Sequence, residues 1–203
     1  MARHLGPRGK VVRRLEYPVF ESPKFGSPRK SYPPGQHGQG RRKKVSTYGI
    51  QLREKQRIKH LYGVLEKQFR NYFKKAAAQQ GPTGHNLLSM LESRLDNTIY
   101  RLGMAPTRRA ARQVVGHKHL LVNGKSVNIP SYLLKPGDSI QIREKSRKME
   151  LVHNAMRRVT EENQMPWLEL DKAQMKGIFL AVPTREEIPE QVNEQLVVEL
   201  YSK

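Results

Sequence analysis

Apolar residues recur at helical spacing from residue 50 onward. One amphipathic segment covers residues 50–61, and a second repeats its apolar positions at i, i+4, i+7, i+8 and i+11 between residues 65 and 76. After the breaker Gly81-Pro82, leucines and one isoleucine recur at i+4 spacing from Leu87 to Ile99. Such spacing gathers apolar side chains on one face of a helix. We therefore predict three amphipathic helices whose apolar faces form a core.

A helix, a turn, a second helix and short strands follow between residues 94 and 142. Leu102-Gly103 ends the first helix, and the hydroxyl of Thr107 is expected to cap the second by accepting a free backbone N–H. On a helical wheel, the second helix has its small apolar residues on one side, Ala110, Ala111, Val114 and Val115. The opposite side carries Arg108, Arg109 and Arg112, which we expect to project outward together.

Turn dipeptides mark the strands. Residues 120–122 are followed by Asn123-Gly124, the pair that favours a type I′ hairpin, and residues 125–127 form the returning strand. Pro136-Gly137-Asp138 marks a further turn before an alternating strand over 139–142. The helices and this small, mostly antiparallel sheet together predict an α+β fold.

The first 45 residues show neither helical nor strand periodicity. They are dense in glycine, proline and cations, with aromatic residues among the cations at Tyr17, Phe20, Phe25 and Tyr32. Such a segment buries too little apolar surface to offset its backbone entropy. We expect an irregular basic arm that becomes ordered against a partner, with its rings packing on bases or sugars of RNA. A flexible solubilising tail is the alternative.

The charge of the chain indicates the class of partner. The 203 residues include 38 Lys or Arg and 18 Asp or Glu, which gives a net charge of +20 and favours a polyanion. Residues 1–60 carry 16 basic and 3 acidic residues, residues 61–150 carry 16 and 6, and residues 151–203 carry 6 and 9. We expect the acidic last segment to serve mainly the fold, a simple counterweight to the basic part being the alternative.

Composition also disfavours several classes of function. The chain has no cysteine, which excludes disulfides, thiolate metal sites and cysteine nucleophiles. Of its seven histidines only His4 and His37 lie in the arm, too few for a structural metal site, so no metal or other cofactor is expected. No run approaches the roughly 18 apolar residues of a membrane span, and residues 1–10 lack a signal-peptide core. We expect neither a membrane partner nor secretion by that route.

An enzyme and a general nucleic-acid-compacting protein are the competing classes. The segment after residue 142 has no Gly-rich phosphate loop, no metal-binding histidine motif and no recognisable catalytic triad. The acidic pairs Glu161-Glu162 and Glu186-Glu187 are more simply explained as solvated residues. A free RNA chaperone or DNA-compacting protein fits the charge, but it does not require the helices and hairpin between residues 94 and 142.

Segment 94–142 resembles the alpha-L RNA-binding motif in the order and spacing of its residues. The matching stretches are Arg94-Leu95-Asp96, Leu102-Gly103, Thr107-Arg108, VNGKSV at 122–127 and GDSI at 137–140. This motif also occurs in pseudouridine synthases, tyrosyl-tRNA synthetases and a heat-shock RNA-binding protein. The resemblance therefore implies RNA binding without indicating a pathway.

The flanking segments are similar to one family, the bacterial-type small-subunit ribosomal protein S-four family in its cysteine-free form. They are PGQHG at 34–38, YGIQLREKQ at 48–56, YGVLEKQF at 62–69 and VELYSK at 198–203. Many relatives carry a zinc-binding cysteine cluster in the arm, which this chain lacks. The resemblance implies a basic arm over 1–45, a helical domain over 46–93 with 180–203, and an inserted alpha-L domain with its extension over 94–179.

The same resemblance implies a structural, non-enzymatic constituent of the small ribosomal subunit. Such a protein binds small-subunit ribosomal RNA at a helix junction of the 5′ domain and nucleates assembly. It contacts the neighbouring small-subunit ribosomal protein five, at an interface tied to decoding accuracy, and lines the messenger RNA entry channel. Repression of its own operon is a further expectation. The expected location is the cytoplasmic ribosome, with the plastid stroma as the alternative.

Cations and polar groups of the arm, the first helix and the alpha-L segment are the expected contacts to ribosomal RNA, because guanidinium and ammonium groups bind phosphate. They are Arg3, Arg8, Lys10, Arg13, Arg14, Arg53, Lys55, Arg57, Arg94, Thr107, Arg108, Arg109, Arg112, Lys118, His119, Asn123 and Lys125. For the helix cations, a merely solvated face is the alternative.

Four consecutive cations follow the glycine-rich run of the arm, namely Arg41, Arg42, Lys43 and Lys44. Successive side chains of an extended segment point to alternating sides. The resemblance implies that this region lies by the messenger RNA entry channel, so we expect the four cations to hold messenger phosphates there. A basic hinge in loose contact with ribosomal RNA is the alternative.

Overall fold

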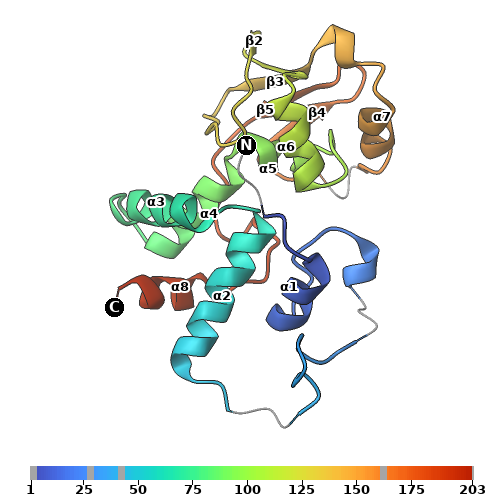
Figure 1. Cartoon of the computed structure of the whole chain (residues 1–203). Helices are drawn as coiled ribbons and strands as arrows, with labels where there is room; N and C mark the ends of the chain where they lie inside the picture. The colour runs from blue at the N-terminus through green and yellow to red at the C-terminus, as the bar shows by residue number, and fades with distance from the viewer. Residues whose placement is uncertain (1–3, 27–29, 41–43, 161–163, 203) are drawn as a thin grey trace. The chain divides into compact units, whose positions relative to one another are not determined.

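The computed structural model describes residues 4–26, 30–40, 44–160 and 164–202, and the chain forms two compact units (Figure 1). One unit comprises His85–Pro189, and the other comprises the chain up to Gly84 together with the segment from Glu190. The described residues form α-helices and a five-stranded antiparallel sheet, which confirms the predicted α+β class.

The unit that contains both chain ends is helical. It is built from α1 (Arg8–Leu15), the 3-10 turn η1 (Pro23–Phe25), α2 (Thr47–Leu61), α3 (Glu66–Ala77) and α8 (Glu194–Tyr201). The predicted helices over 50–61 and 65–76 are thus confirmed as α2 and α3. Helix α8 packs on α2 and buries Val197, while α2 buries Ile58. Two segments far apart in sequence therefore share one core.

The arm contains more regular structure than the sequence pattern indicated. Helix α1 buries Val12 and Leu15, which form a small apolar cluster with Val19 and Phe25. This helix is only eight residues long, and four of its residues are Lys or Arg. Its short apolar stripe was therefore hidden among the cations.

The unit of residues 85–189 combines helices with the sheet. Most of α4 (Thr83–Glu92) belongs to it, followed by α5 (Leu95–Arg101), α6 (Arg108–Gly116) and α7 (Glu150–Met156). The strands are β1 (Leu120–Val122), β2 (Lys125–Ser126), β3 (Ser139–Ile142), β4 (Leu168–Asp171) and β5 (Lys176–Phe179). A 3-10 turn, η2 (Glu144–Ser146), follows β3.

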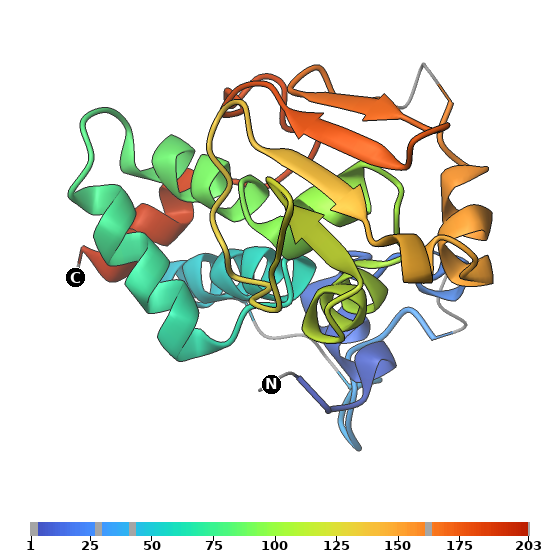
Figure 2. The same ribbon diagram turned by 90° about the horizontal axis from the view of Figure 1, so that it is seen from above.

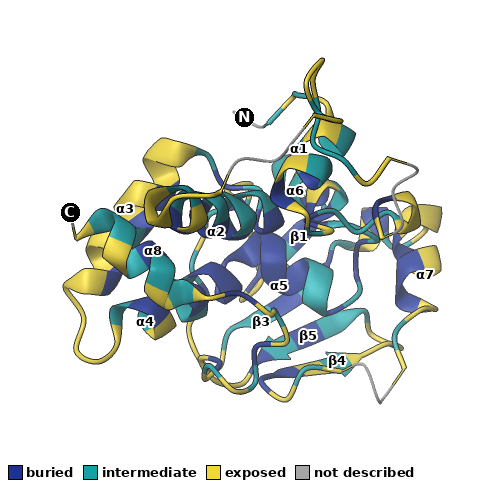
Figure 3. Ribbon diagram, turned by 90° about the horizontal axis from the view of Figure 1, so that it is seen from below, coloured by how far each residue is buried: buried dark blue, intermediate teal, exposed yellow. Residues whose placement is uncertain are grey.

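The sheet has the strand order β2-β1-β3-β5-β4, and each pair of neighbours is antiparallel (Figure 2). The predicted hairpin is confirmed, because Val122 lies opposite Lys125 and both Asn123 and Gly124 have positive φ. The core of this unit includes the fully buried Ile99 and Phe179, and Figure 3 shows α5 and β1 as largely buried. The strands β4 and β5 were not predicted.

The third predicted helix is two helices. Arg94 adopts an extended backbone conformation between α4 and α5 and forms an isolated bridge with Leu133. Backbone hydrogen bonds run from the Leu95 N–H to the Tyr132 carbonyl and from the Leu134 N–H to the Ser93 carbonyl, both at 2.9 Å. The i+4 spacing of the leucines continues through this break, so periodicity alone did not reveal it.

Candidate nucleic-acid interface

Helix α6 is built as its sequence predicts on the apolar side. The Thr107 hydroxyl accepts a hydrogen bond from the Ala110 N–H at 3.1 Å, which confirms the predicted N-cap. Ala111 and Val115 are fully buried against the core. Arg109 is exposed on the surface of the unit, so it is available to a phosphate.

The expectation that Arg108 and Arg112 also project outward is wrong. Arg108 is buried, its Nε donates to Asn97 Oδ1 at 2.8 Å, and its guanidinium lies 4.6 Å from the centroid of the Tyr100 ring. Arg112 forms an ion pair with Asp96, with Nε 2.8 Å from Oδ2. These partners all lie on α5, so the wheel of α6 alone could not show that its cationic side faces another helix.

Arg94 is also directed into the protein. Its Nε and Nη2 donate to the two carboxylate oxygens of Asp96 at 3.0 and 2.7 Å, and both side chains are almost fully buried. A second buried pair joins Arg101 to Glu92, with Nη2 2.7 Å from Oε1. Buried pairs of this kind fix geometry more reliably than they add stability. We therefore interpret Arg94, Arg108 and Arg112 as residues that hold α5 and α6 together beneath the exposed surface.

The hairpin after α6 carries exposed cations on a rigid turn. Asn123 accepts from the Ser139 N–H at 2.9 Å and donates to Asp138 Oδ1 at 2.7 Å, so its amide fixes the turn even though the residue is exposed. Lys118 and Lys125 are exposed on either side of it. The turn therefore presents the ammonium group of Lys125 from a fixed backbone, whereas Lys118 precedes β1.

His119 links this region to the segment after β3. Its Nδ1 lies 2.8 Å from Ser146 Oγ, and its backbone carbonyl accepts from the Arg143 N–H at 3.0 Å. Burial, followed by electrostatic interactions with His117 and Arg143, lowers the pKa of His119. The ring is therefore favoured in its neutral form and helps to join two loops.

Sequence reasoning missed the cations of this second loop. Arg143 donates from Nη1 to the Lys118 carbonyl at 3.1 Å, which brings the segments around residues 118 and 143–148 together. Lys145 and Lys148 are exposed on the same segment. The density of cations in 143–148 was visible in the sequence, but only the fold places them beside Lys118.

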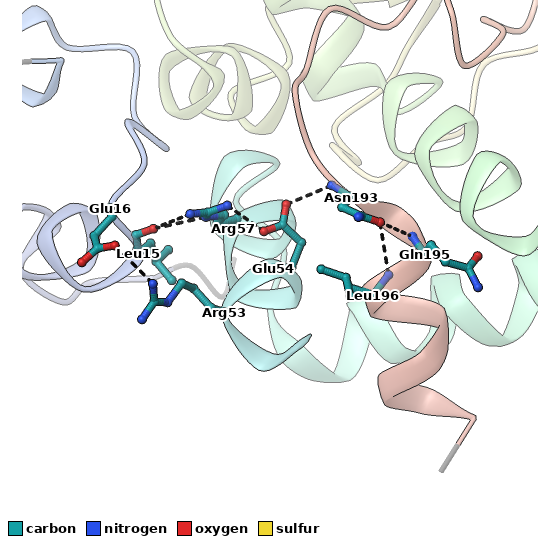
Figure 4. A network of polar contacts seen from close by, with 8 residues as sticks. All are labelled: Leu15, Glu16, Arg53, Glu54, Arg57, Asn193, Gln195 and Leu196. Atoms are coloured by element: carbon teal, nitrogen blue, oxygen red, sulfur yellow. Dashed lines mark hydrogen bonds and ion pairs between the residues drawn. The ribbon is translucent and has the colours of Figure 1, made fainter. Parts of the chain in front are cut away.

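In the helical unit, Lys55 was expected to contact ribosomal RNA, but it is buried. All four Lys and Arg residues of α2 are ion-paired inside the unit. The pairs are Arg53–Glu16 at 3.2 Å, Lys55–Glu66 at 2.6 Å, Arg57–Glu54 at 2.8 Å and Lys59–Glu66 at 3.0 Å. Figure 4 shows Arg57 also donating to the Leu15 carbonyl, while Glu54 accepts from the Asn193 N–H. These cations therefore join α1, α2, α3 and α8.

Glu66 is the shared acceptor of this network. Burial alone would raise the pKa of Glu66, but hydrogen bonds from Lys55 and Lys59 outweigh burial and lower the pKa to about 2. The Tyr201 hydroxyl also donates to Glu66, at 3.0 Å. The carboxylate therefore stays ionised and neutralises the two lysines.

Helix α3, for which no RNA contact was expected, has an exposed cationic face. Its apolar side buries Phe69, Tyr72 and Ala76. Four exposed cations occupy the other side, namely Lys67, Arg70, Lys74 and Lys75. Their spacing of i, i+3, i+7 and i+8 places them on the side of the helix opposite its apolar residues, and this amphipathic pattern is the sequence signal for the cationic face.

In the arm, Arg13 is committed to internal contacts, whereas Lys10 and Arg14 are exposed. The Arg13 Nε donates to the Tyr32 carbonyl at 2.9 Å, and its guanidinium lies 4.7 Å from the Tyr32 ring centroid. Arg8 is half-buried and lies 5.6 Å from the Phe25 ring. Phe25 and Tyr32 thus pack on cations of the arm itself, whereas Tyr17 packs on Arg57 of α2.

Several expected residues lie outside the described residues. These are Arg3 in the arm and Arg41, Arg42 and Lys43 of the expected messenger site, whereas the adjoining Lys44 is described and exposed.

Among the described residues, no group of three or more His, Asp or Glu is placed to hold a metal ion. No helix in the described part of the chain is long and apolar enough to cross a membrane.

Both family models and individual relatives among known proteins match this chain. Residues 3–92 match the ribosomal protein S4/S9 N-terminal domain, and residues 93–140 match the S4 domain. The chain is 56% identical to the small ribosomal subunit protein uS4 of Chlorobaculum tepidum, 55% to that of Parabacteroides distasonis and 54% to that of Bacteroides fragilis. Each similarity spans 203 residues and covers 100% of both chains.

Proposed function

The chain belongs to the small ribosomal subunit protein uS4 family, and we propose from this premise that it is a primary binder of small-subunit ribosomal RNA that nucleates subunit assembly. Proteins of this family are structural components of the small ribosomal subunit, and the chain is such a component rather than an enzyme. We place it in the cytoplasmic ribosome, because the similar proteins come from bacteria.

The observation that carries this proposal is the exposed cationic surface on the matched S4 domain. Arg109, Lys118 and Lys125 are exposed there, whereas the neighbouring Arg108 and Arg112 are engaged with α5. Side chains cannot readily enter the deep major groove of A-form RNA, so binding relies on backbone phosphates, 2′-hydroxyls and the shape of a helix junction. A rigid surface of exposed cations suits that mode of recognition.

A competition experiment tests the proposal. The full chain is titrated with a 5′-domain fragment of small-subunit ribosomal RNA and with a structured RNA of equal length and unrelated sequence. Tight binding to the ribosomal fragment and much weaker binding to the unrelated RNA is expected. Equal affinity for both would reduce the protein to a general polyanion binder and contradict the proposal.

Messenger binding at the entry channel extends this proposal. Lys44 is exposed, and it continues the run Arg41-Arg42-Lys43, whose charge suits the phosphates of a passing strand. We also propose contact with the neighbouring small-subunit ribosomal protein five, with an effect on decoding accuracy. Repression of the chain's own operon would use the same RNA-binding surface on a structured messenger.

The expected domain division completes the proposed function. The arm over 1–45 and the alpha-L domain with its extension over 94–179 serve RNA, and residues 46–93 with 180–203 form the helical support. The packing of α8 on α2 favours this role for the C-terminal segment. Removal of residues 190–203 should therefore loosen the helical support.

A further inference from the structure

A shallow pocket lies in the unit of residues 85–189, where the C-terminal end of α7 meets the turn that joins β4 to β5. It has a volume of about 350 Å³ and is lined by His153, Met156, Arg157, Lys172 and Met175. This volume is near the lower end of the range for ligand pockets, roughly 300–1,000 Å³. The pocket therefore suits one small, flat group rather than an extended ligand.

The two methionines give the pocket an apolar surface. Met156 is buried in the core of the unit, and Met175 is half-buried and packs against the same core. Thioethers are polarisable and adapt to the faces and edges of aromatic rings. His153 adds an exposed ring to the lining. These groups form a surface on which a nucleobase can stack.

The remaining lining groups are cations. Arg157 and Lys172 are both exposed, and none of the five lining residues is acidic. The Lys172 Nζ donates one hydrogen bond, to the Val159 carbonyl at 2.6 Å. An ammonium has three donors, so this bond orients the lysine while further donors stay available. The lining thus selects an anionic group next to a flat apolar one.

The backbone conformation at Met175 supports the interpretation of the pocket as a ligand site. Met175 has a φ of 50°, in the left-handed region that favours glycine. Hydrogen bonds hold this conformation, because Asp171 Oδ1 accepts from the Gln174 N–H at 3.0 Å and the Met175 carbonyl accepts from the Ile142 N–H at 3.1 Å. Residues held in disfavoured backbone conformations cluster at ligand sites, and this one places a methionine where a glycine would fit more easily.

We propose that this pocket binds one unpaired nucleotide of ribosomal RNA, with its base against Met156 and Met175 and its phosphate on Arg157 and Lys172. The inference rests on the proposed function, which supplies the RNA. Proteins that read RNA commonly capture bases that have left the stack, in loops, bulges and ends. The pocket would therefore fix an unpaired nucleotide through residues that lie outside the segment 94–142.

Methyl NMR of the full chain tests this directly. The seven methionines are labelled with ¹³C at their methyl groups, and Met156→Leu and Met175→Leu variants assign the two pocket signals. The probe is a tetra-adenylate RNA, and the control probe is the same RNA with abasic central positions. Ring currents of a stacked base should shift the Met156 and Met175 signals with tetra-adenylate and much less with the abasic strand.

Two variants and one matched control separate the pocket from general charge. Met175→Gly removes the side chain while relieving the backbone, so thermal unfolding should be little changed although affinity for the tetra-adenylate falls about fivefold or more. Arg157→Gln should weaken binding at least fivefold more than Arg158→Gln, an exposed cation one residue away that does not line the pocket.

The outcomes are distinguishable. If the methyl signals of Met156 and Met175 do not shift, or shift equally with the abasic strand, the pocket proposal is overturned. In that case, normal affinity for ribosomal RNA would leave the proposed function intact. Failure of the unmodified chain to bind ribosomal RNA would instead overturn the proposed function.

Discussion

Arg112 and Asp96 form a two-point ion pair that joins α6 to α5, with both Nε and Nη2 of the arginine 2.8 Å from Oδ2 of the carboxylate. Arg94 binds the same carboxylate. The side of α6 that carries Arg108 and Arg112 is therefore an interior surface, and the exposed Arg109 is the α6 cation left for an outside partner. The cations of this protein thus fall into two groups, those that build the fold and those that reach the surface.

Arg108 and Arg109 are adjacent and should behave oppositely. Arg108→Ala leaves Asn97 Oδ1 buried without this donor, so we expect the free energy of unfolding to fall by about 2 kcal/mol. Arg109→Ala should change it by less than about 0.5 kcal/mol, yet weaken binding to ribosomal RNA. Chemical denaturation and an RNA titration of both variants measure this, and equal loss of stability would show that α6 is oriented differently.

Acid should destabilise the helical unit through His60. Burial, followed by electrostatic interactions with Lys59 and His4, lowers the pKa of His60 to about 4. Between pH 6.5 and 4 the unfolded chain therefore binds a proton that the folded chain does not, and stability present above pH 6.5 is lost as the pH falls.

Because His60 is partly exposed, we expect the loss from this group to be only about 1–2 kcal/mol. Denaturation at pH 7 and pH 4.5 should show a smaller pH dependence for His60→Gln than for the unmodified chain. Parallel pH profiles for the two proteins would contradict the assignment.

Deletion of residues 190–203 should loosen helices that are distant in sequence. Val197 is fully buried and α8 packs on α2, and each such apolar side chain contributes about 1.5–3 kcal/mol. Amide exchange in residues 50–76 should accelerate in the truncated chain. The control is Val182→Ala, an exposed residue of the other unit, which should leave that exchange unchanged. Unaltered exchange after the deletion would contradict the supporting role of α8.

Ribosomes with alanine at residues 41–44 test the messenger proposal. Assembly and translation of unstructured messages should be nearly normal, whereas a stable hairpin at the entry channel should stall these ribosomes more often. Alanine at Lys67, Arg70, Lys74 and Lys75 removes the same number of cations from α3 and serves as the control. Equal slowing on structured and unstructured messages would contradict the messenger proposal, and residues 41–44 would then serve only as a general RNA anchor.

The sequence predicted elements that depend on local chemistry. The Asn123-Gly124 hairpin, the Thr107 cap and the helices α2 and α3 follow from turn preference, capping and periodicity, and all are present. The break at Arg94 was missed because it depends on backbone pairing with Leu133, almost forty residues along the chain.

The candidate site was less predictable, because the charge of a residue does not show whether its side chain is paired inside the fold or exposed to a partner. Lys55 was expected to contact RNA, but in the fold it forms an ion pair with Glu66. The i,i+3 pair of Glu54 and Arg57 was readable in the sequence, whereas the Asp96–Arg112 pair required the packing of two helices. Identifying the exposed cations therefore requires the tertiary structure.

The salt dependence of ribosomal RNA binding shows whether the exposed cations hold the RNA through its phosphates. If six phosphates are neutralised, affinity should fall about a thousandfold between 50 and 200 mM salt. Replacing the exposed Arg109 by Gln should reduce the slope of log affinity against log salt by about 1. The control is Arg53→Gln, which removes a cation paired with Glu16. This control should leave the slope unchanged. A flat salt dependence, or equal slopes for the two variants, would contradict binding of RNA phosphates by the exposed cations.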